Sequence, residues 1–202
     1  MKLYYYIKWT MDRILAFWGL VLLSPILIIL SIAIKIDSKG PVFFKQRRIG
    51  LNKKEFYILK FRTMKIDTPQ NIPTHLLENP EQYITKLGAF LRKSSLDELP
   101  QLFNILSGKM SIVGPRPALW NQYDLIQERD KYGANSIYPG LTGWAQVNGR
   151  DELAIEVKAE FDGQYVQKMS LIFDVKIIFH TVIKVFSKHG VVEGVQKTKA
   201  GV

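Results

Sequence analysis

The chain has no cysteine among its 202 residues. A basic chain without cysteine fits a cytoplasmic setting better than a secreted, disulfide-bonded one. The sequence also lacks internal repeats, low-complexity tracts and any visible nucleic-acid-binding motif. These absences argue against a disulfide scaffold and place a membrane-tethered nucleic-acid binder last among the functions considered below.

Residues 14–34 lack any charged side chain. As a continuous helix this segment would be about 32 Å long, enough to cross the hydrocarbon core of a bilayer. Pro25 interrupts it, because proline cannot donate to the carbonyl four residues earlier, here that of Val21. The hydroxyl of Ser24 is close enough to satisfy that carbonyl. We therefore expect a bend at Ser24-Pro25, in a segment that either crosses the membrane or enters it and turns back.

Basic residues flank this apolar segment on both sides. Because lysine and arginine favour the cytoplasmic face, a simple crossing would put one basic cluster on the wrong side, whereas a re-entrant helix keeps both in the cytoplasm. A Pro-kinked crossing helix remains an alternative. A cleaved signal peptide is another, although this apolar run is longer than a usual signal. The flanking residues are Lys2, Lys8 and Arg13 before the run, and Lys35, Lys39, Lys45, Arg47 and Arg48 after it.

Positive charge dominates the composition, with 28 Lys and Arg against 18 Asp and Glu and a formal net charge of +10. Such a balance indicates a polyanionic partner, which can be nucleic acid, anionic lipid or a phosphorylated substrate. The apolar segment favours lipid or a phosphorylated membrane substrate. Without that segment about 165 residues remain, enough for one ordinary domain.

The remaining pattern predicts an α+β fold that is mostly helical. Apolar and aromatic runs at 42–47 and 56–61 predict a β-hairpin with Lys60 on the same face as Phe56 and Ile58. Apolar periodicity predicts helices at 81–93, 118–131, 152–168 and 171–188. Residues 139–143 have the composition of a turn-rich loop. The last helix belongs either to the core, which is the default, or to the bilayer interface.

Two adjacent carboxylates, Asp97 and Glu98, stand just before Pro100. Since proline is tolerated in the first turn of a helix, we expect the N-cap near Asp97, where free N–H groups and the helix dipole keep a carboxylate ionised. An ionised Asp97 can act as a nucleophile. Glu98 can hold Mg²⁺, which prefers oxygen ligands and phosphates. The plain alternative is a helix cap followed by a first-turn acid.

Three arginines suggest a phosphate-binding context for these carboxylates. Arg116 lies between two prolines that restrict its backbone, and a guanidinium suits bidentate phosphate contacts. Arg92 shortly precedes the carboxylate pair, and Arg150 follows a tight Asn-Gly turn. Each arginine alone is most often a solvated surface charge. Together with the apolar segment, they indicate phosphate chemistry at a bilayer surface.

The sequence resembles the bacterial sugar transferase family, the monotopic polyprenyl-phosphate phosphoglycosyl transferases. Matching stretches occur in the family's order and cover nearly the whole chain, whose small size is similar to members that consist of the catalytic module only. The stretches are Ser24-Pro25, Lys60-Phe61-Arg62-Thr63-Met64, Leu96-Asp97-Glu98-Leu99-Pro100-Gln101, Val113-Gly114-Pro115-Arg116-Pro117, and 139–150.

The resemblance implies an architecture. It consists of an N-terminal re-entrant membrane helix hairpin broken at Ser24-Pro25 (residues 1–38), a cytoplasmic catalytic domain (39–193) and a flexible tail (194–202). The domain would carry a small β-hairpin and several amphipathic helices at the membrane interface. The implied location is the cytoplasmic face of the bacterial inner membrane, with anionic lipid as a partner and homo-oligomer formation left open.

The resemblance also implies a two-step reaction with ping-pong kinetics. Asp97 would attack the sugar-linked phosphate of a UDP-sugar and release UMP, and a polyprenyl (undecaprenyl) phosphate would then take the phosphosugar from the carboxylate, as the first membrane step of glycan assembly. Mg²⁺ would be held by Glu98, with Asp97. The phosphate-binding positions implied by the family are Lys60, Arg92, Arg116 and Arg150.

One position departs from the family pattern, because Tyr138 stands where many members carry a basic residue before the Pro-Gly-Leu-Thr-Gly stretch. This difference puts the details of sugar-nucleotide binding in doubt, but it does not change the expected reaction class. The sequence does not reveal which UDP-sugar is used or in which pathway. The non-enzymatic alternative is a basic membrane-surface scaffold, which would have no need of the Asp97-Glu98 pair.

Overall fold

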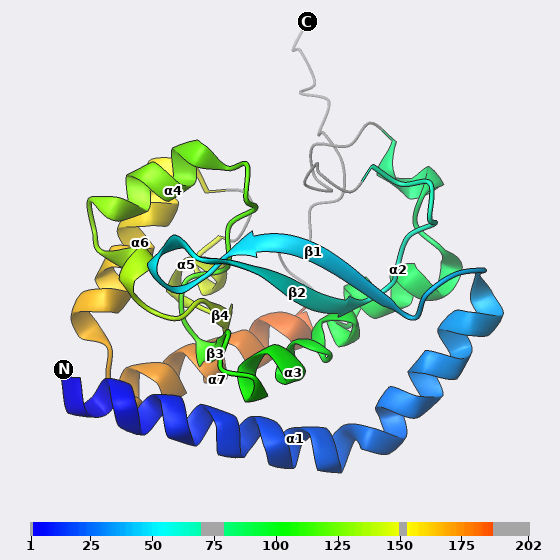
Figure 1. Ribbon diagram of the computed structural model, residues 1–202, viewed down its shortest axis with the longest axis horizontal. Helices are drawn as coiled ribbons and strands as arrows, with labels where there is room; N and C mark the ends of the chain where they lie inside the picture. The colour runs from blue at the N-terminus through cyan, green and yellow to red at the C-terminus, as the bar shows by residue number, and fades with distance from the viewer. Residues whose placement is uncertain (1, 70–78, 150–152, 188–202) are drawn as a thin grey trace, which may run out of the picture.

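The computed structural model describes residues 2–69, 79–149 and 153–187, which form a mostly helical fold with two small sheets (Figure 1). In chain order the elements are α1 (Lys2–Asp37), β1 (Phe43–Ile49), η1 (Leu51–Lys53), β2 (Glu55–Phe61), η3 (Pro80–Gln82), α2 (Lys86–Lys93), η4 (Leu96–Glu98), α3 (Gln101–Leu106), β3 (Ser111–Val113), α4 (Tyr123–Asp130), η5 (Ala134–Ser136), β4 (Gly140–Thr142), α5 (Trp144–Val147), α6 (Ile155–Lys168) and α7 (Leu171–Ser187).

The apolar segment lies within α1, a single helix of 36 residues with Pro25 inside it. Ser24 Oγ donates to the carbonyl of Val21 at 2.8 Å, so the partner expected for the carbonyl freed by proline is confirmed. Figure 1 shows α1 running along one side of the molecule and changing direction in its second half. The expected break therefore takes the form of a bend within one helix. The side of a bilayer on which each end lies stays a prediction.

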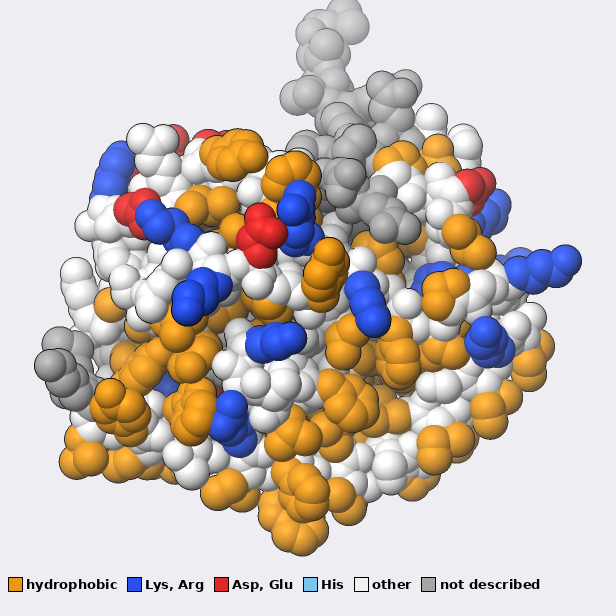
Figure 2. All heavy atoms as spheres, in the orientation of Figure 1, with side chains coloured by type: hydrophobic (Ala, Val, Ile, Leu, Met, Phe, Trp, Pro, Cys, Tyr) orange, Lys and Arg blue, Asp and Glu red, His pale blue; other side chains and the backbone are white. Residues whose placement is uncertain are grey.

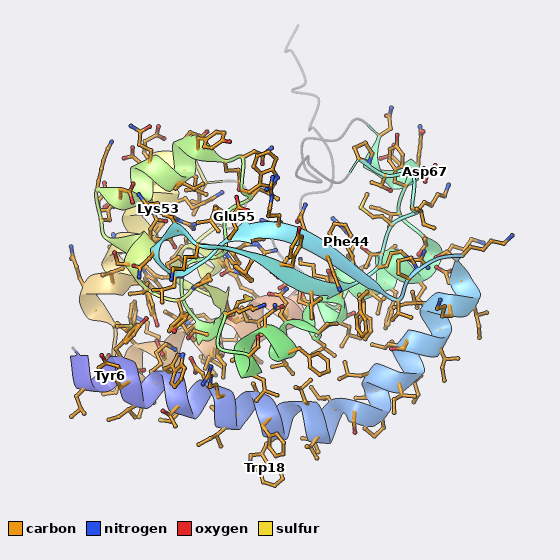
Figure 3. All side chains as sticks on the ribbon, viewed as in Figure 1. Tyr6, Trp18, Phe44, Lys53, Glu55 and Asp67 are labelled. Carbon is orange, nitrogen blue, oxygen red and sulfur yellow. The ribbon has the colours of Figure 1, made fainter. Side chains whose placement is uncertain are left out.

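One face of α1 is exposed and strongly apolar. Among the described residues this is the one helix long and apolar enough to cross a membrane, and only 17% of its most apolar window is buried. Trp18, which points away from the rest of the molecule in Figure 3, is 61% exposed. Apolar side chains line the edge formed by α1 in Figure 2. Burial in the protein core therefore does not explain the apolar character of this exposed face.

The opposite face of α1 belongs to the protein core. Ala16 packs in a cluster with Phe56 of β2 and Ile105 of α3. Leu30 and Ile34 pack in a second cluster with Phe61 of β2 and Leu91 of α2. The helix thus shares a hydrophobic core with the elements that follow it, instead of being attached by a linker alone.

The predicted β-hairpin is confirmed. β1 and β2 pair antiparallel, in a register that runs from Phe43 opposite Phe61 to Ile49 opposite Glu55. The outer edge of β2 is covered by α3, because the Asn104 side chain accepts from the N–H of Leu59 at 2.9 Å and donates to the carbonyl of Tyr57 at 2.8 Å. This pair of contacts holds α3, and the turn before it, against the strand that carries Lys60.

Residues 140–142 form a strand, so the prediction of a loop at 139–143 was wrong. β4 pairs parallel with β3, with Ser111 opposite Gly140 and Val113 opposite Thr142. Glycine and proline gave a local signal of a turn, but the backbone groups of this segment are satisfied by a strand far away in the sequence. The pairing brings the Pro-flanked Arg116 next to the Pro-Gly-Leu-Thr-Gly stretch.

The predicted helices are present with altered limits. Residues 81–93 divide into η3 and the shorter α2, and the helix expected at 118–131 begins only at Tyr123. α6 and α7 agree with expectation up to their ends, and the predicted tail at 194–202 lies outside the described residues. α7 contributes to the core, since Ile177 is buried in a third cluster, whereas Ile172 and Phe179 are 83% and 62% exposed. Its place at a bilayer interface stays a prediction.

Candidate active site

The two adjacent carboxylates lie in η4, a short 3-10 turn between α2 and α3. Ser95 begins this turn in the left-handed region at φ 57°, and Pro100, not Asp97, is the N-cap residue of α3. The predicted capping role of Asp97 was therefore wrong. Pro100 already has helical dihedrals, so α3 begins after it and the carboxylates fall in the preceding turn. Asp97 is buried at 8% exposure.

Lys60 of β2 reaches both carboxylates. Its Nζ lies 2.7 Å from Glu98 Oε1 and 3.9 Å from Asp97 Oδ2. As expected from the strand alternation, Lys60 shares a face with the core residues Phe56 and Ile58, and its side chain is only 16% exposed. A partly buried ammonium between two carboxylates reduces their mutual repulsion and offers a positive charge to an incoming anion.

Arg116 approaches the same carboxylate from the other side. Its Nη2 donates to Glu98 Oε1 at 2.9 Å. The backbone just before Arg116 is held by β4, because the Gly140 N–H donates to the carbonyl of Pro115 at 2.9 Å. About a third of the Arg116 side chain is exposed, at 34%, so the guanidinium borders solvent while holding Glu98. The structure thus brings Lys60, Asp97, Glu98 and Arg116 together through these contacts.

Arg92 and Arg150 complete the predicted basic set. Arg92 lies in the last turn of α2, where its Nη1 contacts Met64 Sδ at 3.8 Å, and its charge lowers the pKa of Asp97. It therefore lies near the carboxylate pair. Arg150 falls outside the described residues, so its predicted phosphate contact stays a prediction.

The environment separates the two carboxylates in acidity. Burial raises the pKa of Asp97, an effect that Lys60 opposes and the neighbouring Glu98 charge reinforces. Burial also acts on Glu98, but Arg116 and Lys60 outweigh it and hold the pKa of Glu98 well below its usual range. Glu98 is thus ionised, whereas Asp97 keeps its proton to higher pH than an exposed aspartate. Titratable groups with separated pKa values are frequent at functional sites.

The carboxylate pair offers oxygen ligands of the kind that Mg²⁺ prefers. Within the described part of the chain, no group of three or more His, Cys, Asp and Glu side chains comes together. Mg²⁺ is usually held by one or two carboxylates together with substrate phosphates, and it keeps several waters. Both contacts of Glu98 given above use Oε1, so the donor set of Glu98 and Asp97 agrees with such a site.

Other polar residues support the site and were not predicted from the sequence. Asn104 fixes α3 on β2, as described above. The guanidinium of Arg62 donates to the carbonyls of Ser38 and Lys39, which ties the end of α1 to β2. Arg62 lies in one of the quoted motif stretches, which was the available signal. Tyr138 stacks on Tyr5 of α1, with ring centroids 5.9 Å apart and an interplanar angle of 9°, so it contacts α1.

The fold combines a long helix, apolar enough to cross a membrane, with a carboxylate pair that contacts the cations Lys60 and Arg116. The model of the family described as "Bacterial sugar transferase" matches residues 3–188, and the chain belongs to that family.

Relatives agree with this membership. The chain is 43% identical over 187 residues to the UDP-glucose:undecaprenyl-phosphate glucose-1-phosphate transferase of Escherichia coli (strain K12), covering 89% of this chain and 40% of that protein. A protein of the same description from Xanthomonas campestris pv. campestris is 40% identical over 90% of this chain and 39% of its own length. The chain thus spans about two fifths of these relatives. The exopolysaccharide production protein ExoY of Rhizobium meliloti is 38% identical over 91% of this chain and 87% of its own length.

Proposed function

We propose that this chain transfers a phosphosugar from a UDP-sugar to undecaprenyl phosphate and releases UMP. The observation that carries the proposal is the pair Asp97 and Glu98, with Lys60 in contact with both carboxylates and Arg116 in contact with Glu98. The names of the Escherichia coli and Xanthomonas relatives, which specify a UDP-sugar donor and an undecaprenyl phosphate acceptor, support the substrate class. A surface scaffold would have no use for such an arrangement of buried charges.

The first step is a displacement at phosphorus. An oxygen of the Asp97 carboxylate attacks the phosphorus that bears the sugar, the bond from that phosphorus to the bridging oxygen breaks, and UMP leaves with the bonding electrons. The sugar remains attached through an acyl phosphate on Asp97. The attack requires ionised Asp97, and the nearby charges of Lys60, Arg92 and Arg116 oppose the effect of burial on its pKa. These cations also offset charge that develops on the diphosphate.

The second step regenerates the carboxylate. A phosphate oxygen of the lipid attacks the same phosphorus, the acyl phosphate bond breaks, and the product is undecaprenyl diphosphate linked to the sugar. Dividing one displacement into two in this way gives ping-pong kinetics. Glu98, with Asp97, would hold Mg²⁺, which supplies charge neutralisation at the diphosphate. Arg116 stays hydrogen-bonded to Glu98 and orients it.

Two features of the chain support a location at the membrane surface. The exposed apolar faces of α1 and α7 support contact with a bilayer, and the net charge of +10 supports anionic lipid. Since the nucleotide substrate is cytoplasmic and the acceptor phosphate lies at the membrane surface, we place the site at the cytoplasmic face of the inner membrane. A re-entrant α1 would bring both of its ends to that face.

The test is UMP release by the purified protein in nanodiscs that contain undecaprenyl phosphate, with a screen of UDP-sugars that begins with UDP-glucose. We expect UMP release to require Mg²⁺ and Asp97. We expect repeated turnover to require undecaprenyl phosphate as well. The variant Asp97→Asn has nearly the same shape but a poor nucleophile, so it should lose turnover and the radiolabelled phosphosugar adduct. Full turnover by Asp97→Asn would rule out the covalent route, and absence of release with every UDP-sugar would rule out the function.

A further inference from the structure

A buried polar network joins the first turns of α1 to three other elements. Lys8 Nζ lies 2.7 Å from Asp174 Oδ2 of α7 and 3.2 Å from Asp12 Oδ2. Asp174 also accepts from the Tyr165 hydroxyl of α6 at 2.7 Å, and Asp12 accepts from the Ser111 hydroxyl at the start of β3. Sequence reasoning assigned Lys8 to a basic flank at the membrane surface, but the residue is only 7% exposed.

Burying this network costs free energy, because its charged groups lose contact with water. Lys8, Asp12 and Asp174 are each less than a tenth exposed, so all three charges have given up most of their hydration. Buried ion pairs of this kind add little net stability compared with apolar residues of the same size, although removing one partner is strongly unfavourable. What they do provide is a directional set of contacts that admits few alternative arrangements.

The network leads directly to the site through β3. Ser111 is the first residue of β3, and only Gly114 and Pro115 separate the strand from Arg116. Asp12 Oδ2 also accepts from the N–H of Ile112 at 3.3 Å. The link has little freedom, because a Cβ on Gly114 would lie 2.5 Å from the carbonyl oxygen of Tyr138. A shift of β3 relative to α1 is therefore passed on to Arg116 and to its contact with Glu98.

α1 holds the partner strand as well. Tyr5 stacks on Tyr138, which stands two residues before β4. Within the pair, Gly114 N–H donates to the carbonyl of Thr142 at 2.8 Å. Both strands next to Arg116 are thus held by the first turns of α1. The Asp12 carboxylate holds β3, and the Tyr5 ring holds the residue that precedes β4.

We infer that Lys8 and Asp12 of α1 are positioning residues for Arg116, so that the membrane helix orients the site in addition to attaching it to lipid. The activity readout below rests on the proposed function, whereas the exchange readout does not. Displacing a reacting group or its support by about 1 Å can cost on the order of a hundredfold in rate. The network acts over a short, stiff connection of that kind.

The test compares three variants of the full chain in nanodiscs. Asp12→Asn keeps the shape but removes the charge, and Ser111→Ala removes the hydroxyl, while Ser111→Thr keeps a hydroxyl and should restore function. The matched control is Asp162→Asn, which breaks an equally buried pair with Arg129 (2.6 Å) between α6 and α4. All variants are first compared in thermal unfolding, so that loss of folded protein is separated from displacement of Arg116.

Hydrogen exchange at the amides of Gly114 and Gly140 reports the β3–β4 pairing without any substrate. We expect about tenfold faster exchange at these amides in Asp12→Asn and Ser111→Ala, and no local change in Asp162→Asn. We expect kcat/KM for UMP release to fall about tenfold in the same two variants. In a chain that already carries Arg116→Ala, Asp12→Asn should cause no further loss of kcat/KM. Unchanged exchange at these amides, or an equal increase in Asp162→Asn, overturns the inference. Absence of UMP release from the unmodified chain would instead contradict the proposed function, and exchange would still decide the positioning role.

Discussion

Lys60 Nζ lies 2.7 Å from Glu98 Oε1, and this contact connects the β1–β2 hairpin to η4, the turn that carries the carboxylate pair. The same ammonium is 3.9 Å from Asp97 Oδ2. A single cation thus acts on two acids of different character, with Glu98 held ionised and the pKa of Asp97 raised by burial. The consequences of this arrangement can be measured.

The first prediction concerns pH. The proposed attack on phosphorus requires ionised Asp97, so kcat/KM should rise with pH through the Asp97 pKa, above the ordinary aspartate value of about 3.9. Lys60 lowers that pKa, so Lys60→Gln should move the acid limb to higher pH. The charge of Glu98 raises it, so Glu98→Gln should move the limb to lower pH. Profiles of kcat/KM against pH provide the check, and shifts of the same sign in both variants would contradict it.

The second prediction concerns the shape of the cation at 116. Arg116→Lys keeps the charge but loses the planar fork that can bind Glu98 and a phosphate together, so kcat/KM should fall about tenfold, equal to about 1.4 kcal/mol. Arg47→Lys is the control, because Arg47 stacks on Trp120 (3.9 Å) and pairs with Glu55 on the hairpin. Steady-state kinetics of both proteins should separate them. Equal losses would show that arginine geometry at 116 is unimportant.

The third prediction concerns the close approach of β3 and β4 at Gly114 and Gly140. A Cβ on Gly140 would lie 2.1 Å from the backbone nitrogen of Gly114, and backbone atoms of a paired strand cannot yield cheaply. Gly140→Ala should therefore destabilise the protein by about 1–3 kcal/mol or more. Gly19→Ala is the control, since its Cβ would meet Leu102 Cδ1 at an ordinary 3.5 Å. Thermal unfolding in nanodiscs measures both, and an unchanged Tm for Gly140→Ala would disagree with the observed pairing.

The fourth prediction concerns the topology of α1. A cysteine-free chain accepts single reporter cysteines without background. We expect Leu3→Cys and Lys39→Cys, near the two ends of the helix, both to resist a membrane-impermeant maleimide in intact spheroplasts. Both should react after permeabilisation, because the basic flanks favour the cytoplasmic side. Labelling of one position from outside would mean that α1 crosses the bilayer.

Local sequence patterns determined much of the fold. Apolar periodicity located the main helices, and the alternation of apolar residues located the hairpin and the face of Lys60. Proline chemistry located the bend in α1 and the Ser24 contact that accompanies it. These features depend on interactions within a few residues, so they are readable from the sequence. Most of the candidate site residues lie in motif stretches, whose order is also a property of the sequence, whereas Arg92 was selected because it shortly precedes the carboxylate pair.

The tertiary structure decided what depends on contacts between distant segments. It paired residues 111–113 with 140–142, although glycine and proline suggested a loop, and it put Asp97 in a turn before α3 and not at its N-cap. It also showed that Lys8 is buried against Asp174, which no local pattern distinguishes from a surface lysine. The physical reason is that burial and hydrogen-bond partners are set by packing between elements, whereas propensity and periodicity describe each element alone.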